Sequence, residues 1–145
     1  NLALASLLVA LTFAIHFIGL VGLSWVMRRR YMLHPDQFSG VIWQGGTIIS
    51  LVLGLFALHS VQIWMYALTY IVLGQFKSIE AALYFSTSAF TTVGFGEIVL
   101  SPTWRMLAAA ESANGFLLIG WSTAFLVSVT ARVRLFEEEV DRQNK

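Results

Sequence analysis

The chain of 145 residues contains no cysteine, and only 12% of its residues are charged. Without cysteine it can form no disulfide, no thiolate metal site and no cysteine nucleophile. Hydrophobic residues make up 57% of the sequence, a share that a soluble domain of this size could hardly keep in solution. We therefore expect an all-α membrane protein.

The sequence also lacks the usual signatures of catalysis. It has no phosphate-binding loop, no nucleophile triad and no metal-ligand cluster, so we expect neither an enzyme nor a cofactor. No apolar run carries arginine at every third position, which argues against a voltage sensor of the usual type. We expect no nucleic-acid partner.

Three apolar runs are long enough to cross a bilayer, and they cover residues 2–27, 41–74 and 105–131. As helices they would extend about 40 to 50 Å, compared with a hydrocarbon core of about 30 Å. Tilt, projection into water or a break at Gly45 and Gly46 can absorb the excess length of the second run. We expect three transmembrane helices.

A short segment separates the second and third runs. Residues 79–90 would form a helix of about 18 Å, which is too short to cross a bilayer and fits a re-entrant helix. Ser78 is a suitable N-cap, and Glu80 in the first turn is favoured by the helix dipole. Ser101 and Pro102 are expected to cap and begin the next helix.

Positive charges predict the orientation of the spans. Arginines at 28–30 follow the first run, and Arg132 and Arg134 follow the third. Both groups fall on one side of the membrane, and the positive-inside rule assigns that side to the cytoplasm. We therefore expect the N-terminus outside and the C-terminus in the cytoplasm, with the short helix entering from outside.

Residues 91–97 read TTVGFGE and lie directly after the short helix. Non-helical backbone cannot face lipid, because its unpaired N–H and C=O groups would be costly there. Gly94 and Gly96, at alternate positions, allow successive carbonyl groups to point toward one axis. Such a row of carbonyls can replace the hydration shell of a cation. One chain supplies only one side of the site, so we expect a fourfold assembly.

This segment, with the short helix before it and the span after it, resembles the pore module of potassium channels over roughly residues 66–134. The additional leading span resembles small bacterial channel proteins, which implies a bacterial inner membrane and a homotetramer with one pore loop per chain. The resemblance names the parts as follows: first transmembrane helix 1–30, cytoplasmic loop 31–40, pore domain 41–134 (outer helix 41–74, pore helix 79–90, filter 91–97, inner helix 102–134) and cytoplasmic tail 135–145.

The resemblance also assigns site residues. Potassium would bind the carbonyl oxygens of Thr92, Val93, Gly94 and Phe95, with Gly96 at the outer mouth. Supporting residues would be Thr91, Glu97, Ser88, Tyr84 and Glu111. A cavity would be lined by Phe116, Ile119, Thr123 and Val127, with a hinge at Gly115.

Three positions depart from the family pattern. Phe95 stands where tyrosine is commoner, which removes a hydroxyl that usually ties the filter to its pore helix. Glu97 replaces the commoner aspartate, and Ser88 stands where some members carry a buried acid. The expected function is potassium-selective conduction. The alternatives are a weakly selective cation channel and a non-conducting accessory protein with a pore-like fold.

Several polar residues in the spans have two interpretations. On a helical wheel Glu111 faces the pore helix, where a hydrogen bond to Ser86 or Ser88 is favoured over an effect on gating. His16 and His59 are interpreted as packed neutral side chains, in preference to a pH sensor or metal site.

Two further groups of polar residues are treated in the same way. Asn114 and Ser122 are expected to join helices rather than touch ions. For the arginines at 28–30, membrane topology is preferred to specific lipid recognition.

Overall fold

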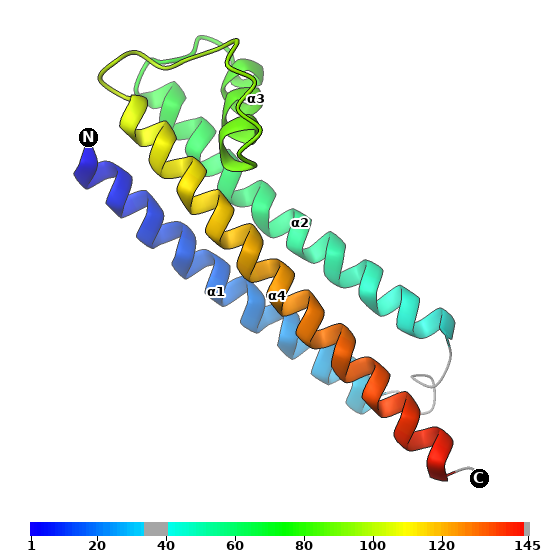
Figure 1. The fold of residues 1–145 in the computed structure, drawn as a ribbon. Coiled ribbons are helices and arrows are strands. Elements are labelled where there is room, and N and C mark those ends of the chain that lie inside the picture. Colours follow the sequence, from blue (N-terminus) through cyan, green and yellow to red (C-terminus); the bar gives the residue numbers. More distant parts are fainter. Residues whose placement is uncertain (34–40, 144–145) are drawn as a thin grey trace.

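The computed structural model describes residues 1–33 and 41–143, and these residues contain helices but no strand. Figure 1 shows three long helices lying side by side and one short helix at one end. The helices are α1 (Leu2–Leu33), α2 (Val41–Val72), α3 (Ile79–Phe90) and α4 (Arg105–Gln143). The short helix α3 covers the same residues as the expected re-entrant helix.

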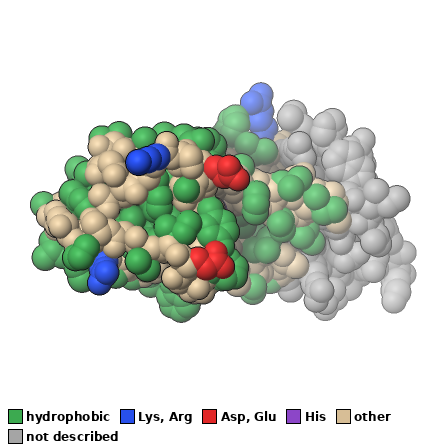
Figure 2. All heavy atoms as spheres, turned by 90° about the horizontal axis from the view of Figure 1, so that it is seen from above, with side chains coloured by type: hydrophobic (Ala, Val, Ile, Leu, Met, Phe, Trp, Pro, Cys, Tyr) green, Lys and Arg blue, Asp and Glu red, His purple; other side chains and the backbone are tan. Residues whose placement is uncertain are grey.

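Three segments are long and apolar enough to cross a membrane, namely Leu2–Arg29, Gly45–Val72 and Arg105–Ala131. The N-terminus, α3 and the start of α4 lie at one end of the bundle, and the end of α4 lies at the other (Figure 1). Viewed onto one face, Figure 2 shows scattered charged side chains among hydrophobic ones. Three apolar helical segments of this length are typical of a multi-pass membrane protein.

The first two long helices differ from the sequence expectation at their ends. Helix α1 continues to Leu33, so residues 31–33 are helical instead of belonging to a loop. The rest of the expected loop, residues 34–40, lies outside the described residues. Helix α2 passes through Gly45 and Gly46 without a break and ends at Val72, because the following turn places Gly74 at a φ of +69°.

Helix α4 begins later and ends later than expected. Residues 102–104 form a turn, so Pro102 is not the first helical residue. Ser101 is not the cap of this helix, because α4 begins only at Arg105; the Ser101 hydroxyl donates to Gln75 Oε1 at 2.8 Å. At the other end the helix continues to Gln143, so most of the expected tail is helical.

The core forms where α3 packs between α2 and α4. Its fully buried apolar side chains include Tyr66 and Tyr70 on α2, Phe90 on α3, and Leu107 and Leu118 on α4. Buried α4 residues recur every three or four positions, the spacing of a single helical face. The same face carries three buried polar residues, Glu111, Asn114 and Ser122. The interior of this bundle is therefore partly polar.

Candidate functional site: the segment 91–97 and its supports

The short helix α3 is fixed at its start and along its buried face. Ser78 caps it, because its side-chain oxygen accepts a hydrogen bond from the Ala81 N–H. Glu111 of α4 is fully buried and accepts hydrogen bonds from the Ser86 hydroxyl at 2.5 Å and the Tyr70 hydroxyl at 2.6 Å. One carboxylate therefore joins α2, α3 and α4. Of the two partners considered for Glu111, it contacts Ser86.

After Phe90 the chain leaves helical geometry and enters the segment 91–97. Left-handed φ values occur at alternate residues: +61° at Thr92, +57° at Gly94 and +80° at Gly96. The residues between them, Val93 and Phe95, do not have positive φ. A left-handed conformation costs a non-glycine residue about 1–2 kcal/mol, so the surrounding contacts must hold Thr92 in place.

Several backbone N–H groups of this segment donate hydrogen bonds to residues of α3. Thr92 N–H donates to the Ala89 carbonyl at 3.0 Å, and Gly94 N–H donates to the Ser88 carbonyl at 3.2 Å. Phe95 N–H donates to the Ser88 hydroxyl at 3.3 Å. The peptide bonds of this segment are trans, so each C=O points opposite to the N–H of its own peptide unit. The carbonyls of Val93 and Gly94 therefore point away from α3.

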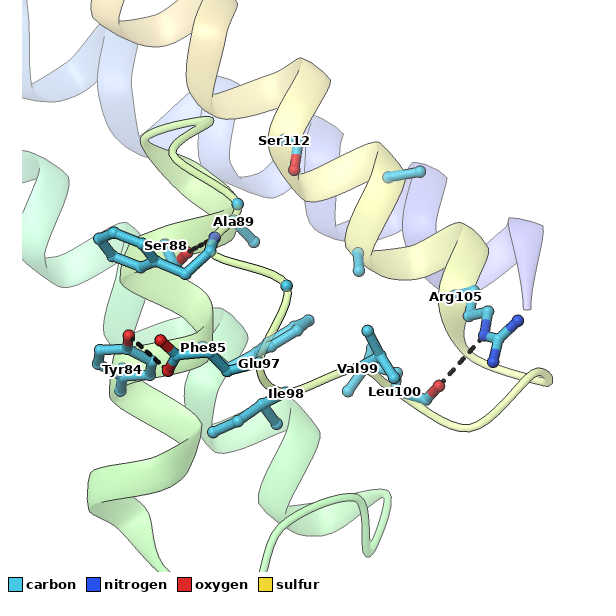
Figure 3. A pocket seen from close by; sticks show the side chains of 15 residues that line it. Tyr84, Phe85, Ser88, Ala89, Glu97, Ile98, Val99, Leu100, Arg105 and Ser112 are labelled. Atoms are coloured by element: carbon cyan, nitrogen blue, oxygen red, sulfur yellow. Dashed lines mark hydrogen bonds between the residues drawn. The ribbon is translucent and has the colours of Figure 1, made fainter.

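Side chains of α3 also contact the far end of the segment. The Tyr84 hydroxyl donates to Glu97 Oε2 at 3.2 Å, and the Tyr84 and Phe95 rings stack with centroids 6.0 Å apart. Figure 3 shows Tyr84 and Glu97 lying next to each other at this edge. The Thr91 hydroxyl donates to the Thr87 carbonyl at 2.7 Å. The four residues Thr91, Ser88, Tyr84 and Glu97 thus contact the segment or belong to it.

A pocket of about 250 Å³ lies between the segment and α4 (Figure 3). Ser88, Phe95 and Glu97 line one side of it, and Ala108 and Ser112 of α4 line the other. Around this pocket the segment is held by α3, with open space toward α4. Its backbone position therefore depends on how firmly α3 itself is fixed.

Gly115 of α4 packs against the last residue of α3. Of the described glycines, it is the one where an added Cβ would come closest to another atom. A Cβ placed there would overlap the Phe90 carbonyl group, which is backbone and cannot turn aside as a side chain could. Helix α4 is continuous through this residue. The close contact requires a residue without a side chain at position 115. The hinge at Gly115 stays a prediction.

Three of the four expected cavity residues lie on the side of α4 away from the core. Phe116 and Val127 are 67% and 64% exposed, and Thr123 is also exposed. Ile119 differs, because it is partly buried against the core cluster. Three of the four residues therefore share an accessible face of α4.

Sequence reasoning considered the polar residues of the spans one at a time and missed their connections. Asn114 donates to the Thr12 hydroxyl at 2.8 Å and to the Tyr66 hydroxyl at 3.1 Å, which joins α4 to α1 and α2. Gln62, which the sequence analysis did not single out, is fully buried and contacts His16. Polar residues at helical spacing within apolar runs were the signal that could have revealed this network.

Comparison with known proteins identifies the family to which most of the chain belongs. A family model described as "Ion channel" matches residues 48–132, more than half of the sequence. No curated protein and no solved structure matches the chain. The matched range contains α3, the segment 91–97 and the helices that hold them, and it describes a channel family, not an enzyme family. The chain belongs to this ion channel family.

Proposed function

We propose that four copies of this chain form a potassium-selective channel, with the segment 91–97 of each copy lining the ion path. In this proposal the carbonyl oxygens of residues 92–95 replace the water around K⁺, and the Thr92 hydroxyl completes the innermost site. The channel conducts K⁺ passively and needs no cofactor.

The alternating backbone of the segment 91–97 is the observation that carries this proposal. Left-handed conformations at Thr92, Gly94 and Gly96 alternate with negative φ at the residues between them. Because the N–H groups of Gly94 and Phe95 both face α3, two successive carbonyls point to the opposite side. Four such strands around an axis would present stacked rings of oxygen atoms, which is the coordination that a dehydrated cation requires.

Exposed apolar side chains in the segment 91–97 and on α4 support the fourfold assembly. In the single chain Val93 is 55% exposed, Phe95 is 62% exposed and Phe116 is 67% exposed. Non-helical backbone cannot face lipid, so the segment 91–97 needs water or other protein around it. Three further copies would supply both, and lipids would cover the outward faces of α1 and α2.

A second candidate function, weakly selective cation conduction, is favoured by the contacts of Phe95. Its side chain has no hydroxyl and holds its position through stacking on Tyr84. The backing of the segment then rests on two hydrogen bonds, one from the Phe95 N–H to the Ser88 hydroxyl and one from the Tyr84 hydroxyl to Glu97. A segment that can adjust its width discriminates less between K⁺ and Na⁺.

Flux measurements on the purified protein in liposomes test these functions. We expect K⁺ flux that exceeds Na⁺ flux by at least about tenfold, and loss of that preference in Gly94→Ala, because alanine resists the left-handed angle. Equal fluxes would support the weakly selective channel. No flux under varied voltage and pH, or an assembly that is not fourfold by native mass spectrometry, would overturn the proposal of a tetrameric channel.

We further propose an inner bacterial membrane, with the N-terminus outside and the C-terminus in the cytoplasm. The absence of cysteine makes this easy to test with single-cysteine variants. In right-side-out vesicles, Lys77→Cys should react with an impermeant maleimide and Arg28→Cys should not. The reverse pattern would contradict this orientation.

A further inference from the structure

A second cluster of polar side chains lies between the three long helices, apart from the segment 91–97. It consists of His16 on α1, His59 and Gln62 on α2, and Ser122 on α4, and we call it the His16–His59 cluster. His16 and Gln62 are fully buried, and Ser122 is 5% exposed. Polar side chains in an apolar interior are costly unless each donor meets an acceptor, so their hydrogen bonds can be followed one by one.

Four contacts join these side chains in a closed circuit. Gln62 Nε2 lies 3.2 Å from His16 Nδ1, and His16 Nε2 lies 3.3 Å from Ser122 Oγ. The same Ser122 Oγ lies 3.0 Å from His59 Nε2, and His59 Nδ1 lies 3.1 Å from Gln62 Oε1. Each imidazole thus uses both of its nitrogens.

A fifth contact fixes the direction of the circuit. Gln62 Nε2 also lies 3.3 Å from the Thr12 carbonyl oxygen, which can only accept, so the amide NH₂ faces Thr12 and His16. His16 Nδ1 therefore accepts, and its protonated Nε2 donates to Ser122. The Ser122 hydroxyl donates to His59 Nε2, and His59 Nδ1–H donates to Gln62 Oε1. In this arrangement every donor has an acceptor and both imidazoles are neutral.

The same arrangement argues against a metal ion at the cluster. A metal held by both Nε2 atoms would require a proton on both Nδ1 atoms. His16 Nδ1 would then direct its N–H at the NH₂ of Gln62, donor against donor. The amide cannot turn over without placing its oxygen against the Thr12 carbonyl.

Proton uptake affects the two histidines differently. His16 would need its new proton at Nδ1, where it meets the same Gln62 NH₂ group. His59 would need its proton at Nε2, where the Ser122 oxygen can accept a second hydrogen bond. The Ser122 hydroxyl would then turn to the carbonyl one helical turn before it, as Thr12 and Thr123 already do. His59 is therefore the group that can take up a proton.

Among its contacts in the described structure, a charged His59 meets no acidic side chain. Its ring lies 5.3 Å from that of His16. Among the described residues, the other ionisable side chains buried on the packed elements are Tyr66, Tyr70 and Glu111. Tyr66 bonds to Asn114, and Glu111 is held by Tyr70 and Ser86. The face of α3 toward His59 presents the hydrocarbon ring of Phe90. An uncompensated charge there should open the circuit.

The cluster contacts the end of α3 directly. The His59 and Phe90 rings lie 5.7 Å apart, and Phe90 is the last residue of α3 before the segment 91–97. Phe90 is fully buried, and its carbonyl is pressed against Gly115 on the other side. A shift of His59 therefore moves the residue from which the segment begins.

We propose that the His16–His59 cluster is a proton-responsive latch that holds α1 to the helices of the ion path, and that protonation of His59 lowers K⁺ conduction. This inference rests on the proposed channel function. It assigns α1 a task beyond crossing the membrane, because α1 supplies one corner of the circuit.

Liposome flux with the same buffer on both sides tests the latch. We expect wild-type K⁺ flux to fall by about threefold or more between about pH 7.5 and pH 5.5, the range in which histidine ordinarily titrates. His59→Gln should keep its flux over this range. His34→Gln is the matched control, because His34 is the third histidine of the chain and lies outside the four residues of the cluster; it should respond as the wild type does.

A readout independent of conduction separates this proposal from the channel proposal. Nitrogen NMR of histidine-labelled His34→Gln protein should show one Nε2–H and one Nδ1–H tautomer near neutral pH, and protonation of a single histidine at about pH 5.5. Two identical tautomers, or flux that does not change while His59 becomes charged, would overturn the latch. A pH response that survives in His59→Gln would also overturn it. Absence of flux at neutral pH would instead count against the channel itself.

Discussion

The two sides of α3 are held in different ways. On the buried side, one carboxylate from α4 binds hydroxyl groups of α2 and α3 with short hydrogen bonds. On the exposed side, the segment 91–97 is held by longer contacts from Ser88 and Tyr84, with a pocket between it and α4. The buried side fixes the position of the helix, whereas the exposed side leaves the carbonyls of Val93 and Gly94 directed away from α3, as the proposed ion path requires.

Glu111→Ala should remove the buried hydrogen bonds that hold α3 and should lower stability more than the other variants. It removes the acceptor of two hydroxyl groups and opens a cavity; the Ser86 hydroxyl can still donate to the Ile63 carbonyl at 3.0 Å, but the Tyr70 hydroxyl is left unsatisfied in the interior, at a total cost of roughly 3–5 kcal/mol in the free energy of unfolding. The melting temperature and tetramer fraction in detergent should both fall. Glu80→Gln, an exposed position at the start of α3, is the control and should lower both far less, because it removes only a favourable helix-dipole interaction of about 0.3–1 kcal/mol. A stable Glu111→Ala tetramer would contradict this division between the two sides.

Gly115→Ala tests the contact between α4 and the end of α3. The added methyl group meets the Phe90 backbone, which cannot move aside as a side chain could, so we expect a loss of about 1–3 kcal/mol and several-fold lower flux. Gly120→Ala is the matched control on the same helix, because no atom lies within 4 Å of its added Cβ. That variant should be neutral or slightly more stable, since alanine favours helix. Equal behaviour of the two variants would argue against the steric role of Gly115.

Tyr84→Phe tests the exposed side and should have the smallest effect on stability. It removes one hydrogen bond to Glu97 while keeping the ring that stacks on Phe95, so we expect a loss of about 1 kcal/mol or less. The informative measurement is the ratio of K⁺ to Na⁺ flux, which should fall while the melting temperature barely changes. A large drop in melting temperature with an unchanged ratio would reverse the roles assigned to the two sides.

Much of the architecture could be predicted from the sequence. Run lengths identified the three spans, and the family match and the helices bear out a multi-pass channel-family protein. The helix over 79–90 followed from a capping serine and a short apolar stretch, which are local features. The predicted C-terminal ends of α1 and α4 were wrong, because polar residues do not stop a helix that continues beyond the bilayer. Potassium selectivity and fourfold assembly stay predictions.

For the segment 91–97, the sequence alone determined that its backbone had to be satisfied by something other than helix or lipid, because glycines alternate in a short stretch between apolar helices. Only the tertiary structure decided which groups satisfy it: Ser88 and Ala89 accept the N–H bonds, and Glu111 fixes the helix that carries them. It also joined His16 to His59 through Gln62 and Ser122. These partners lie far apart in the chain, and only packing of the helices brings them within hydrogen-bond distance.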